Sequence, residues 1–257
     1  MKEKLKLALD FALRDLKERY VGTGLGQLWF ILSPLVMIFI YSVIFADFMK
    51  MKLNIVDNTY AYSIYLIPGL FAWTAFANTI SRLTTSFFEK ANLIKKINVP
   101  MYVFHLSIVL SEFITFSISM LLGVIFLFIV HQPVTINFLI IIPIMILQSI
   151  FTLGLGVIFS LFTPFFKDLK EIVPIILQLW FWMTPIVYIR DLLEKKYPLL
   201  IIINPFYYFA RVYQDIFLYN KLPTLHNILI MLIETTIVIL LSAYLYKKMI
   251  ATIKDII

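Results

Sequence analysis

The amino-acid sequence predicts an all-α integral membrane protein with six transmembrane helices, an N-terminal amphipathic interfacial helix and an outer re-entrant helical hairpin between spans five and six. Its 257 residues are 61% hydrophobic and 14% charged, whereas soluble domains carry about 45–50% apolar and about 25% charged residues. A soluble core of this size cannot hide so much apolar surface. The apolar residues form continuous rather than alternating runs, so helices rather than strands satisfy the backbone in lipid.

Six apolar runs are long enough to cross a bilayer, which takes about 20 residues as a helix. They lie at residues 28–49, 61–80, 102–130, 138–163, 172–189 and 225–246. We expect residues 1–257 to form one transmembrane domain. Its parts are the interfacial helix at 1–21, the first five spans within 28–189, the outer hairpin at 190–224 and the last span at 225–246. No cleavable signal peptide is expected, because residues 1–20 are densely charged.

Lysine and arginine are unevenly distributed between the two sides of this topology. Fifteen lie in the N-terminal segment, the second and fourth connections and the C-terminus, and seven lie in the other connections. Because cytoplasmic segments carry the excess of positive charge, we expect both termini in the cytoplasm. The net charge of +7 then fits anionic lipid headgroups rather than nucleic acid.

Residues 1–20 have the pattern of an amphipathic helix in the membrane plane. Apolar residues recur at helical spacing, and charged residues occupy another face: Leu5, Leu9, Ala12, Leu16 and Tyr20 against Lys6, Asp10, Arg14 and Lys17. Gly22, Gly24 and Gly26 follow and favour a hinge into the first span. The Gly22-to-Gly26 spacing also permits a small-residue packing motif.

The segment 190–224 is apolar and aromatic, but Pro198, Asn204-Pro205 and Pro223 interrupt it. Neither half is long enough to span a bilayer, and short hydrophobic pieces are typical of re-entrant or interfacial segments. We interpret it as a helical hairpin that enters the outer leaflet. The alternative is a surface loop with aromatic anchors.

The sequence lacks the motifs of several kinds of enzyme and of nucleotide-binding proteins. There is no P-loop pattern, no H-E-x-x-H, no G-x-S-x-G and no cysteine. The three histidines are scattered over different elements, so no metal site is expected. These absences argue against an enzyme and against nucleotide binding by this chain.

Two acidic residues, Glu112 and Glu234, lie well inside predicted spans. A carboxylate at that depth is costly and usually faces a cavity or a partner. One interpretation is a polar contact along a pathway or a proton relay. The other, which we favour, is a hydrogen-bonded glutamate that holds helices together.

Aromatic residues make up 16% of the chain, and most are expected at the membrane interfaces. Tyr41, Trp73, Trp180 and Trp182 fall within predicted spans. Their rings are candidates for a channel lining that a sugar polymer could slide past, although packing against lipid is the default role of any single ring.

The connection at 81–100 has an apolar stripe at helical spacing, formed by Phe87, Ala91 and Ile94. Such a short helix suits docking in a groove of a partner protein. A plain connecting helix on the membrane surface fits the same spacing.

Four stretches resemble a known family in the expected order. They are RDLKERYVGTGLGQLWFILSPLVMIFIYSVIF (14–45), ANLIKKINVP (91–100), FKDLKEIVPIILQLWFWMTPIVY (166–188) and INPFYYFARVYQDIF (203–217). They resemble the type-2 ABC transporter permeases that export polysaccharides, in particular the O-antigen and teichoic-acid export permeases. This chain departs from the family pattern at Lys167, where relatives often carry arginine before the residue that matches Asp168. Lysine keeps the positive charge but lacks the planar guanidinium that can donate two parallel hydrogen bonds.

The resemblance implies a permease in the cytoplasmic (inner) membrane that exports a lipid-linked polysaccharide. Its partners would be a second copy of itself, two ATP-binding cassette subunits that hold the ATP and magnesium, and a glycan on an undecaprenyl diphosphate carrier. The chain itself would hold no cofactor. Residues 198–218 would form outer gate helices.

The resemblance also implies roles for individual residues. A helix at 88–97 would couple the permease to the ATPase. Its coupling residues would be Phe88, Glu89, Lys90, Ala91, Asn92, Leu93, Ile94, Lys95 and Lys96. The outer gate would include Asn204, Pro205, Tyr207, Tyr208 and Arg211. The cations Arg14, Lys17 and Arg19 are our candidates for attracting the carrier diphosphate at the cytoplasmic entrance.

Two other functions compete with this interpretation. One is a type-2 ABC permease for a drug or a small lipid. The other is a membrane-embedded transferase acting on lipid-linked sugars, which would need a cluster of acids on one water-exposed loop.

Overall fold

The computed structural model describes residues 2–44, 58–89, 99–190, 194 and 196–256, and these residues form helices and connections without a strand. The elements are α1 (Lys2–Glu18), η1 (Gly26–Leu28), α2 (Trp29–Tyr41), α3 (Ala61–Glu89), α5 (Tyr102–Ile129), η3 (Ile136–Ile140), α6 (Ile141–Phe162), α7 (Leu169–Met183), α9 (Pro198–Ile203), α10 (Tyr207–Tyr219) and α11 (Leu225–Ile256). The all-α prediction is therefore confirmed for the part of the chain that is described.

Among the described residues, five helical segments are long and apolar enough to cross a membrane: Gly26–Ile44, Ala61–Glu89, Tyr102–Ile129, Ile136–Phe162 and Leu225–Ile253. The predicted run at 172–189 differs, because α7 ends at Met183 after only 15 residues. At about 1.5 Å per residue, α7 is shorter than the hydrocarbon core, which is about 30 Å thick. The sequence-based boundary at 189 was wrong, since Thr184 has an extended backbone that ends the helix.

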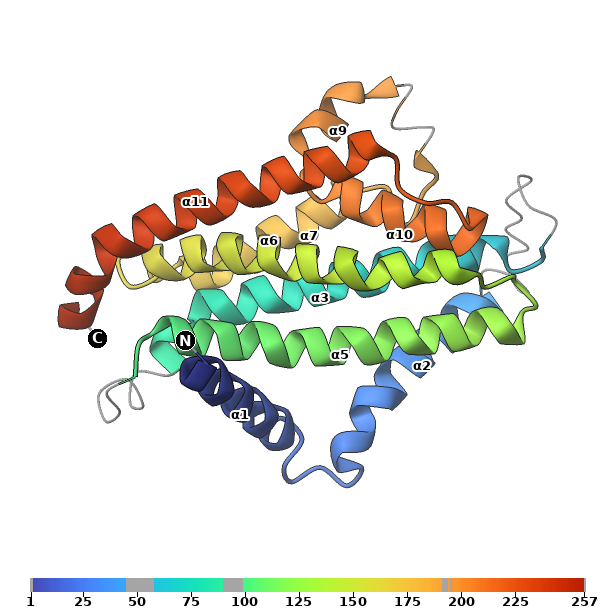
Figure 1. Cartoon of the computed structure of the whole chain (residues 1–257). Coiled ribbons are helices and arrows are strands. Elements are labelled where there is room, and N and C mark those ends of the chain that lie inside the picture. Colours follow the sequence, from blue (N-terminus) through green and yellow to red (C-terminus); the bar gives the residue numbers. More distant parts are fainter. Residues whose placement is uncertain (1, 45–57, 90–98, 191–193, 195, 257) are drawn as a thin grey trace.

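Helix α3 forms the centre of the bundle. It packs against α5, α6, α7 and α10, and nearly every side chain from Ala61 to Trp73 is buried. Helix α6 also packs along α11. In Figure 1, α3, α5, α6 and α11 run side by side as one layered bundle, and α2 slants away from it. A helix that is apolar all round is expected where neighbours cover every face.

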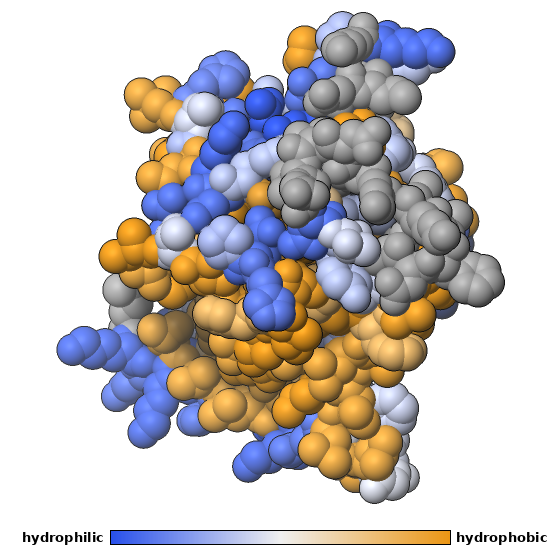
Figure 2. All heavy atoms as spheres, turned by 90° about the vertical axis from the view of Figure 1, so that its right-hand side faces the viewer, coloured by the Kyte–Doolittle hydropathy of each residue, from blue (hydrophilic) through white to orange (hydrophobic). Residues whose placement is uncertain are grey.

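Both termini lie at the same end of the bundle (Figure 1), together with the end of α3 and the start of α5. The opposite end, shown in Figure 2, has hydrophilic side chains gathered above a broad hydrophobic region. Large apolar side chains remain exposed on the spans themselves, including Phe39, Phe128, Leu139 and Leu240. Such exposure is expected of helices that face lipid tails.

The N-terminal segment forms the helix α1, which buries only part of the predicted apolar face, together with Ala8. Ala8, Ala12 and Leu16 are buried, and α1 packs along α5 with the ring of Phe11 stacked on Phe104 at 5.4 Å between centroids. Leu5 and Leu9, expected on the apolar face, are exposed. Ala8 and Ala12 face α5 because their small side chains let the two helix backbones come close.

The three glycines after α1 form a turn. Gly22 and Gly26 have φ values of +84° and +52°, a conformation that favours glycine over residues with a side chain. No atom lies within 4 Å of a Cβ built at any of the three. The positive φ values fit a change of chain direction here, and no neighbour among the described residues supports the packing motif at Gly22 and Gly26.

The predicted outer hairpin consists of two helices, α9 and α10, joined at Asn204–Phe206. The two differ in burial: Leu199, Ile202 and Ile203 of α9 are exposed, whereas Tyr213 and Phe217 of α10 are fully buried. Helix α10 packs on α3, and Gly69 of α3 allows this approach because a Cβ there would lie 3.2 Å from Gln214 Nε2. A surface loop is thus excluded for α10.

Candidate functional site

Four charged side chains from three helices and a turn meet where α1 reaches the bundle. Arg82 of α3 donates from Nη1 to Glu112 Oε1 at 2.7 Å and from Nη2 to Asp15 Oδ1 at 2.6 Å. Arg19, just past α1, donates to the same Glu112 oxygen at 2.7 Å and to Asp15 Oδ2 at 3.3 Å. We call Asp15, Arg19, Arg82 and Glu112 the ion-pair cluster. It joins α1 to both α3 and α5.

The ion-pair cluster is mostly removed from water and its charges balance. Glu112 is 3% exposed, Asp15 19%, and each arginine 24%. Ser111 Oγ accepts a further bond from Arg82 at 3.0 Å. Burial alone would raise the pKa of Asp15, but Arg82 and Arg19 beside it hold that pKa below its usual value. The structural interpretation of Glu112 therefore fits: it is paired and holds three elements together.

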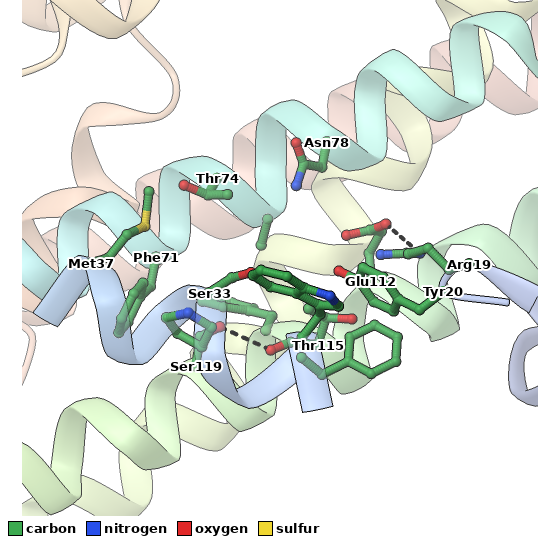
Figure 3. Close-up of a pocket in the computed structure, with 15 residues that line it drawn as sticks. Arg19, Tyr20, Ser33, Met37, Phe71, Thr74, Asn78, Glu112, Thr115 and Ser119 are labelled. Atoms are coloured by element: carbon green, nitrogen blue, oxygen red, sulfur yellow. Dashed lines mark hydrogen bonds and ion pairs between the residues drawn. The ribbon is translucent and has the colours of Figure 1, made fainter. Parts of the chain in front are cut away.

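A pocket of about 250 Å³ lies beside the ion-pair cluster, between the α1–α2 corner, α3 and α5. Figure 3 shows Arg19 and Glu112 at one end of it, and Met37 and Phe71 towards the other. Its polar lining consists of Ser33, Thr74, Asn78, Thr115 and Ser119, and its aromatic lining includes Tyr20, Trp29, Phe30, Phe71 and Phe116.

Hydroxyl and amide groups interleaved with rings can hold a polar, ring-shaped ligand. The hydroxyls and the amide supply hydrogen bonds, and the rings supply flat apolar faces. Within the described ranges, no group of three or more His, Cys, Asp or Glu side chains could hold a metal ion. The lining of this pocket suits the binding and positioning of a ligand.

The three cations predicted for the entrance have different surroundings. Arg19 belongs to the ion-pair cluster and also lines the pocket. Arg14 is exposed and pairs with Glu18 at 2.6 Å. Lys17 is exposed, and no described carboxylate lies within ion-pair distance of it. The attraction of a diphosphate by these three cations stays a prediction; Arg19 differs from the other two because it already neutralises buried carboxylates.

The four aromatic residues predicted for the channel differ in how far they are buried. Trp73 is only 7% exposed, and its ring packs edge-on against Trp180 and Phe206 with centroids 6.1 and 5.1 Å apart. Tyr41 is half-buried, and its carbonyl accepts a bond from Ser63. Trp182 is 59% exposed. Of these rings, Trp182 has the largest open face in the isolated chain.

Asn204, predicted in the outer gate, is a buried anchor. Its Oδ1 accepts from Trp180 Nε1 at 2.6 Å and from the Phe206 backbone at 3.1 Å. Its Nδ2 donates to Thr184 Oγ1 at 2.8 Å and to the Met183 carbonyl at 3.3 Å. This side chain therefore ties the end of α7 to the turn between α9 and α10.

We expect Asn204→Ala to lower the free energy of unfolding by about 2 kcal/mol, because the half-buried Trp180 N–H loses its acceptor together with the other bonds. Trp180→Phe removes one donor and should cost about 1 kcal/mol. Thermal unfolding of the purified variants checks both values. An Asn204→Ala variant as stable as the parent protein would contradict the anchoring role.

Two of the predicted outer-gate residues, Tyr207 and Arg211, belong to a second ionic group with residues that were not predicted for the gate. Arg190 pairs with Asp215 at 2.5 Å, and Arg211 lies 3.6 Å from Glu194 and 3.7 Å from Asp215. The Tyr207 hydroxyl donates to Glu194. Burial works to lower the pKa of Arg190, but Asp215 raises it above the ordinary value.

Two further outer-gate candidates have less extensive contacts. Tyr208 is half-buried, and its ring meets His226 at 6.4 Å between centroids. Pro205 lies half-buried in the turn between α9 and α10. The structure thus brings all five gate candidates into one region around α10.

The predicted coupling residues lie only partly in the described ranges. Phe88 and Glu89 are exposed at the last turn of α3, whereas Lys90, Ala91, Asn92, Leu93, Ile94, Lys95 and Lys96 lie outside the described residues. Phe87, expected on a docking stripe, is instead buried with Met101, Leu161 and Ile253. That expectation was wrong because α3 continues through Phe87 and turns this ring inwards.

Sequence reasoning missed Asp15 and Arg82. Arg82 was assigned to a connection, yet it lies within α3 at the depth of Glu112. Two signals were available. Residues that favour a helix continue past residue 80, and Glu112, an acid inside a span, required a partner.

Comparisons with known proteins place this site in context. The profile of the family described as ABC-2 type transporter matches residues 11–218. Two proteins named "O-antigen export system permease protein RfbA" from Klebsiella pneumoniae are 34% identical over 210 residues and 32% identical over 237 residues. These matches cover 81% and 92% of this chain and 79% and 89% of the relatives. A protein of the same name from Myxococcus xanthus is 28% identical over 221 residues, covering 84% of this chain and 82% of the relative.

Proposed function

The chain belongs to the ABC-2 type transporter family, and from this premise we propose that it is the membrane permease that exports a lipid-linked polysaccharide, powered by a separate ATPase. The observation that carries the proposal is the similarity to O-antigen export permeases over 92% of the chain. Membership of a permease family also accounts for a chain without a P-loop, because the nucleotide-binding subunit of such a transporter is another polypeptide or domain.

The proposed assembly contains two copies of this chain and two ATP-binding cassette subunits that hold ATP and magnesium. It resides in the cytoplasmic membrane, with both termini in the cytoplasm. This orientation is supported by the excess of cations in the segments at the end where both termini lie. The sixth crossing would consist of the short α7 with the chain that follows it, and α9 with α10 would form the outer gate.

The pocket beside the ion-pair cluster is the proposed cytoplasmic entrance. Its mixture of hydroxyl, amide and aromatic groups fits sugar rings next to the carrier. Arg14 and Lys17, on the last turns of α1, are exposed and would attract the diphosphate. Arg19 would position the entrance through Glu112 and Asp15 rather than hold the diphosphate by itself.

Beyond the entrance, Trp182 is the best placed of the candidate rings for contact with a passing glycan, since it is the most exposed. Coupling to the ATPase would involve Phe88 and Glu89 at the end of α3 and the residues that follow. A permease for a drug or small lipid remains the second candidate, because the pocket also has apolar rings.

The entrance is tested with the complex of permease and ATPase in nanodiscs. Arg14→Gln/Lys17→Gln should raise the concentration of lipid-linked glycan needed for half-maximal stimulation of ATP hydrolysis by about tenfold or more. The shift is expected because the double variant loses two cations that attract an anionic group near the membrane surface. Basal hydrolysis should stay unchanged.

Lys221→Gln is the matched control, because Lys221 is a cation beyond α10, far along the chain from α1. It should leave the glycan dependence unaltered. Equal stimulation of the double variant and the parent complex would refute the entrance. Stimulation by a small lipid without any glycan would favour the second candidate.

A further inference from the structure

A second hollow of about 360 Å³ lies away from the proposed entrance, between α5, α6 and α11. On α11 its wall is a stripe at helical spacing, Ile239, Ser242, Ala243, Tyr246 and Lys247. We call this hollow the α11 groove. It extends about 12 Å along α11, at 1.5 Å per residue.

The α11 groove is lined mainly by apolar surface, and Lys247 and two tyrosines stand at one end of it. Leu153, Val157 and Ile239 line its inner part, and Tyr102, Tyr246 and Lys247 line the end near the chain termini. Ser242 is buried. A ligand that fills the groove therefore needs a long apolar part and a polar head at the terminal end.

One cation lines that end of the groove, and a second contacts one of its wall residues. Lys247 lines the groove itself. Lys4 of α1 holds its Nζ 5.7 Å from the centroid of the Tyr102 ring, which is part of the groove wall. No described carboxylate lies within ion-pair distance of Lys4, Lys247 or the neighbouring Lys248. The head of the ligand is thus expected to be anionic.

We propose that the α11 groove binds one anionic phospholipid, with an acyl chain along α11 and the phosphate between Lys4 and Lys247. An acyl chain matches the apolar inner wall, where it would pack against Leu153 and Ile239. The phosphate meets the two cations, beside Tyr102 and Tyr246 of the groove wall. The bound lipid would contact α1, α5, α6 and α11 at once.

Native mass spectrometry of the purified protein, titrated with phosphatidylglycerol or phosphatidylcholine in mixed micelles, tests the site. One phosphatidylglycerol should bind several-fold more tightly than phosphatidylcholine. Lys4→Gln/Lys247→Gln should weaken phosphatidylglycerol about thirtyfold, since each cation contributes about fivefold, and should leave phosphatidylcholine unchanged. Equal binding of the two lipids by the parent protein would overturn the proposal.

Ala243→Trp, which fills the α11 groove from an exposed position, should abolish the tight binding of phosphatidylglycerol. If that variant does not fold, the lysine variant decides alone, because both lysines are exposed and removing them disturbs no packing. Lys221→Gln is the control for charge and should bind as the parent does. Displacement of the lipid by an equal concentration of inorganic phosphate would show a phosphate site without an acyl chain, and would also overturn the proposal.

Discussion

Arg82→Met is expected to lower the free energy of unfolding by about 3 kcal/mol. Removing one partner of a buried ion pair costs about 3–5 kcal/mol because the other charge stays buried without compensation. The lower end applies because the arginines of the cluster keep 24% of their side chains exposed. Without Arg82, Asp15 and the buried Glu112 share only Arg19, so two carboxylates compete for one guanidinium. Thermal and denaturant unfolding of the purified permease measure the loss.

A double-mutant cycle isolates the pairing itself. Glu112→Gln alone leaves two arginines against one carboxylate, whereas Arg82→Met/Glu112→Gln leaves a neutral Asp15–Arg19 pair, 3.3 Å apart in the parent protein. The double variant should therefore lose less than the sum of the single variants, by about 1 kcal/mol or more. Strict additivity would show that Arg82 and Glu112 do not stabilise one another.

Arg14→Met is the matched control for the cycle. Arg14 also pairs with a glutamate at 2.6 Å, but both side chains are more than half exposed. Exposed pairs contribute little to stability, because water and salt screen the attraction between their charges. Similar destabilisation by Arg14→Met and Arg82→Met would mean that burial is not what makes the ion-pair cluster important.

Gly156→Val is expected to cause the other large loss of stability, because the larger side chain would force α6 away from α3. A Cβ at position 156 would lie 2.3 Å from Leu83 Cδ1 and 2.9 Å from Leu83 Cβ. The Leu83 Cβ is fixed to its backbone, so rotating that side chain cannot remove the overlap. Overpacked cores lose about 1–3 kcal/mol and occasionally more; we expect about 3 kcal/mol for Gly156→Ala and aggregation for Gly156→Val. Unfolding and size-exclusion profiles in detergent report these outcomes.

Two further variants test the cause of this loss. Gly24→Ala introduces the same methyl group where no atom lies within 4 Å of it, and should change stability by less than about 0.5 kcal/mol. Leu83→Ala/Gly156→Ala should recover part of the stability lost by Gly156→Ala, because the shorter side chain relieves the contact. If Gly156→Ala behaves like Gly24→Ala, close packing of α3 and α6 at this point is refuted.

Most of the helices could be predicted from the sequence, and the differences have local physical causes. The spans that contain α3, α5, α6 and α11 were expected near their observed positions, since hydropathy over about 20 residues reports burial in lipid directly. The end of α7 and the inward turn of Phe87 were missed. Both depend on where a helix stops, and an apolar window cannot tell a helical residue from an extended one.

The candidate site was predicted only in part. Arg19 was identified as a cation near the entrance, and Glu112 as a buried acid that needs a partner, but their contact spans 93 residues of sequence. Arg82 was placed outside the membrane, so its bonds to Asp15 and Glu112 had no basis in any local pattern. Asn204 was named for the gate, whereas its bonds to Trp180 and Thr184 show an anchor.

By itself the sequence determined the class of this protein: long apolar helices, an excess of cations at one end and family stretches in order are properties of single segments. Only the tertiary structure decided that Ala8, Ala12 and Leu16 rather than Leu5 and Leu9 seat α1 on α5, and that Glu112 binds two arginines from different elements. The reason is physical: insertion into lipid depends on the hydropathy of each helix alone, whereas charge pairing and close packing depend on which faces of separate helices meet.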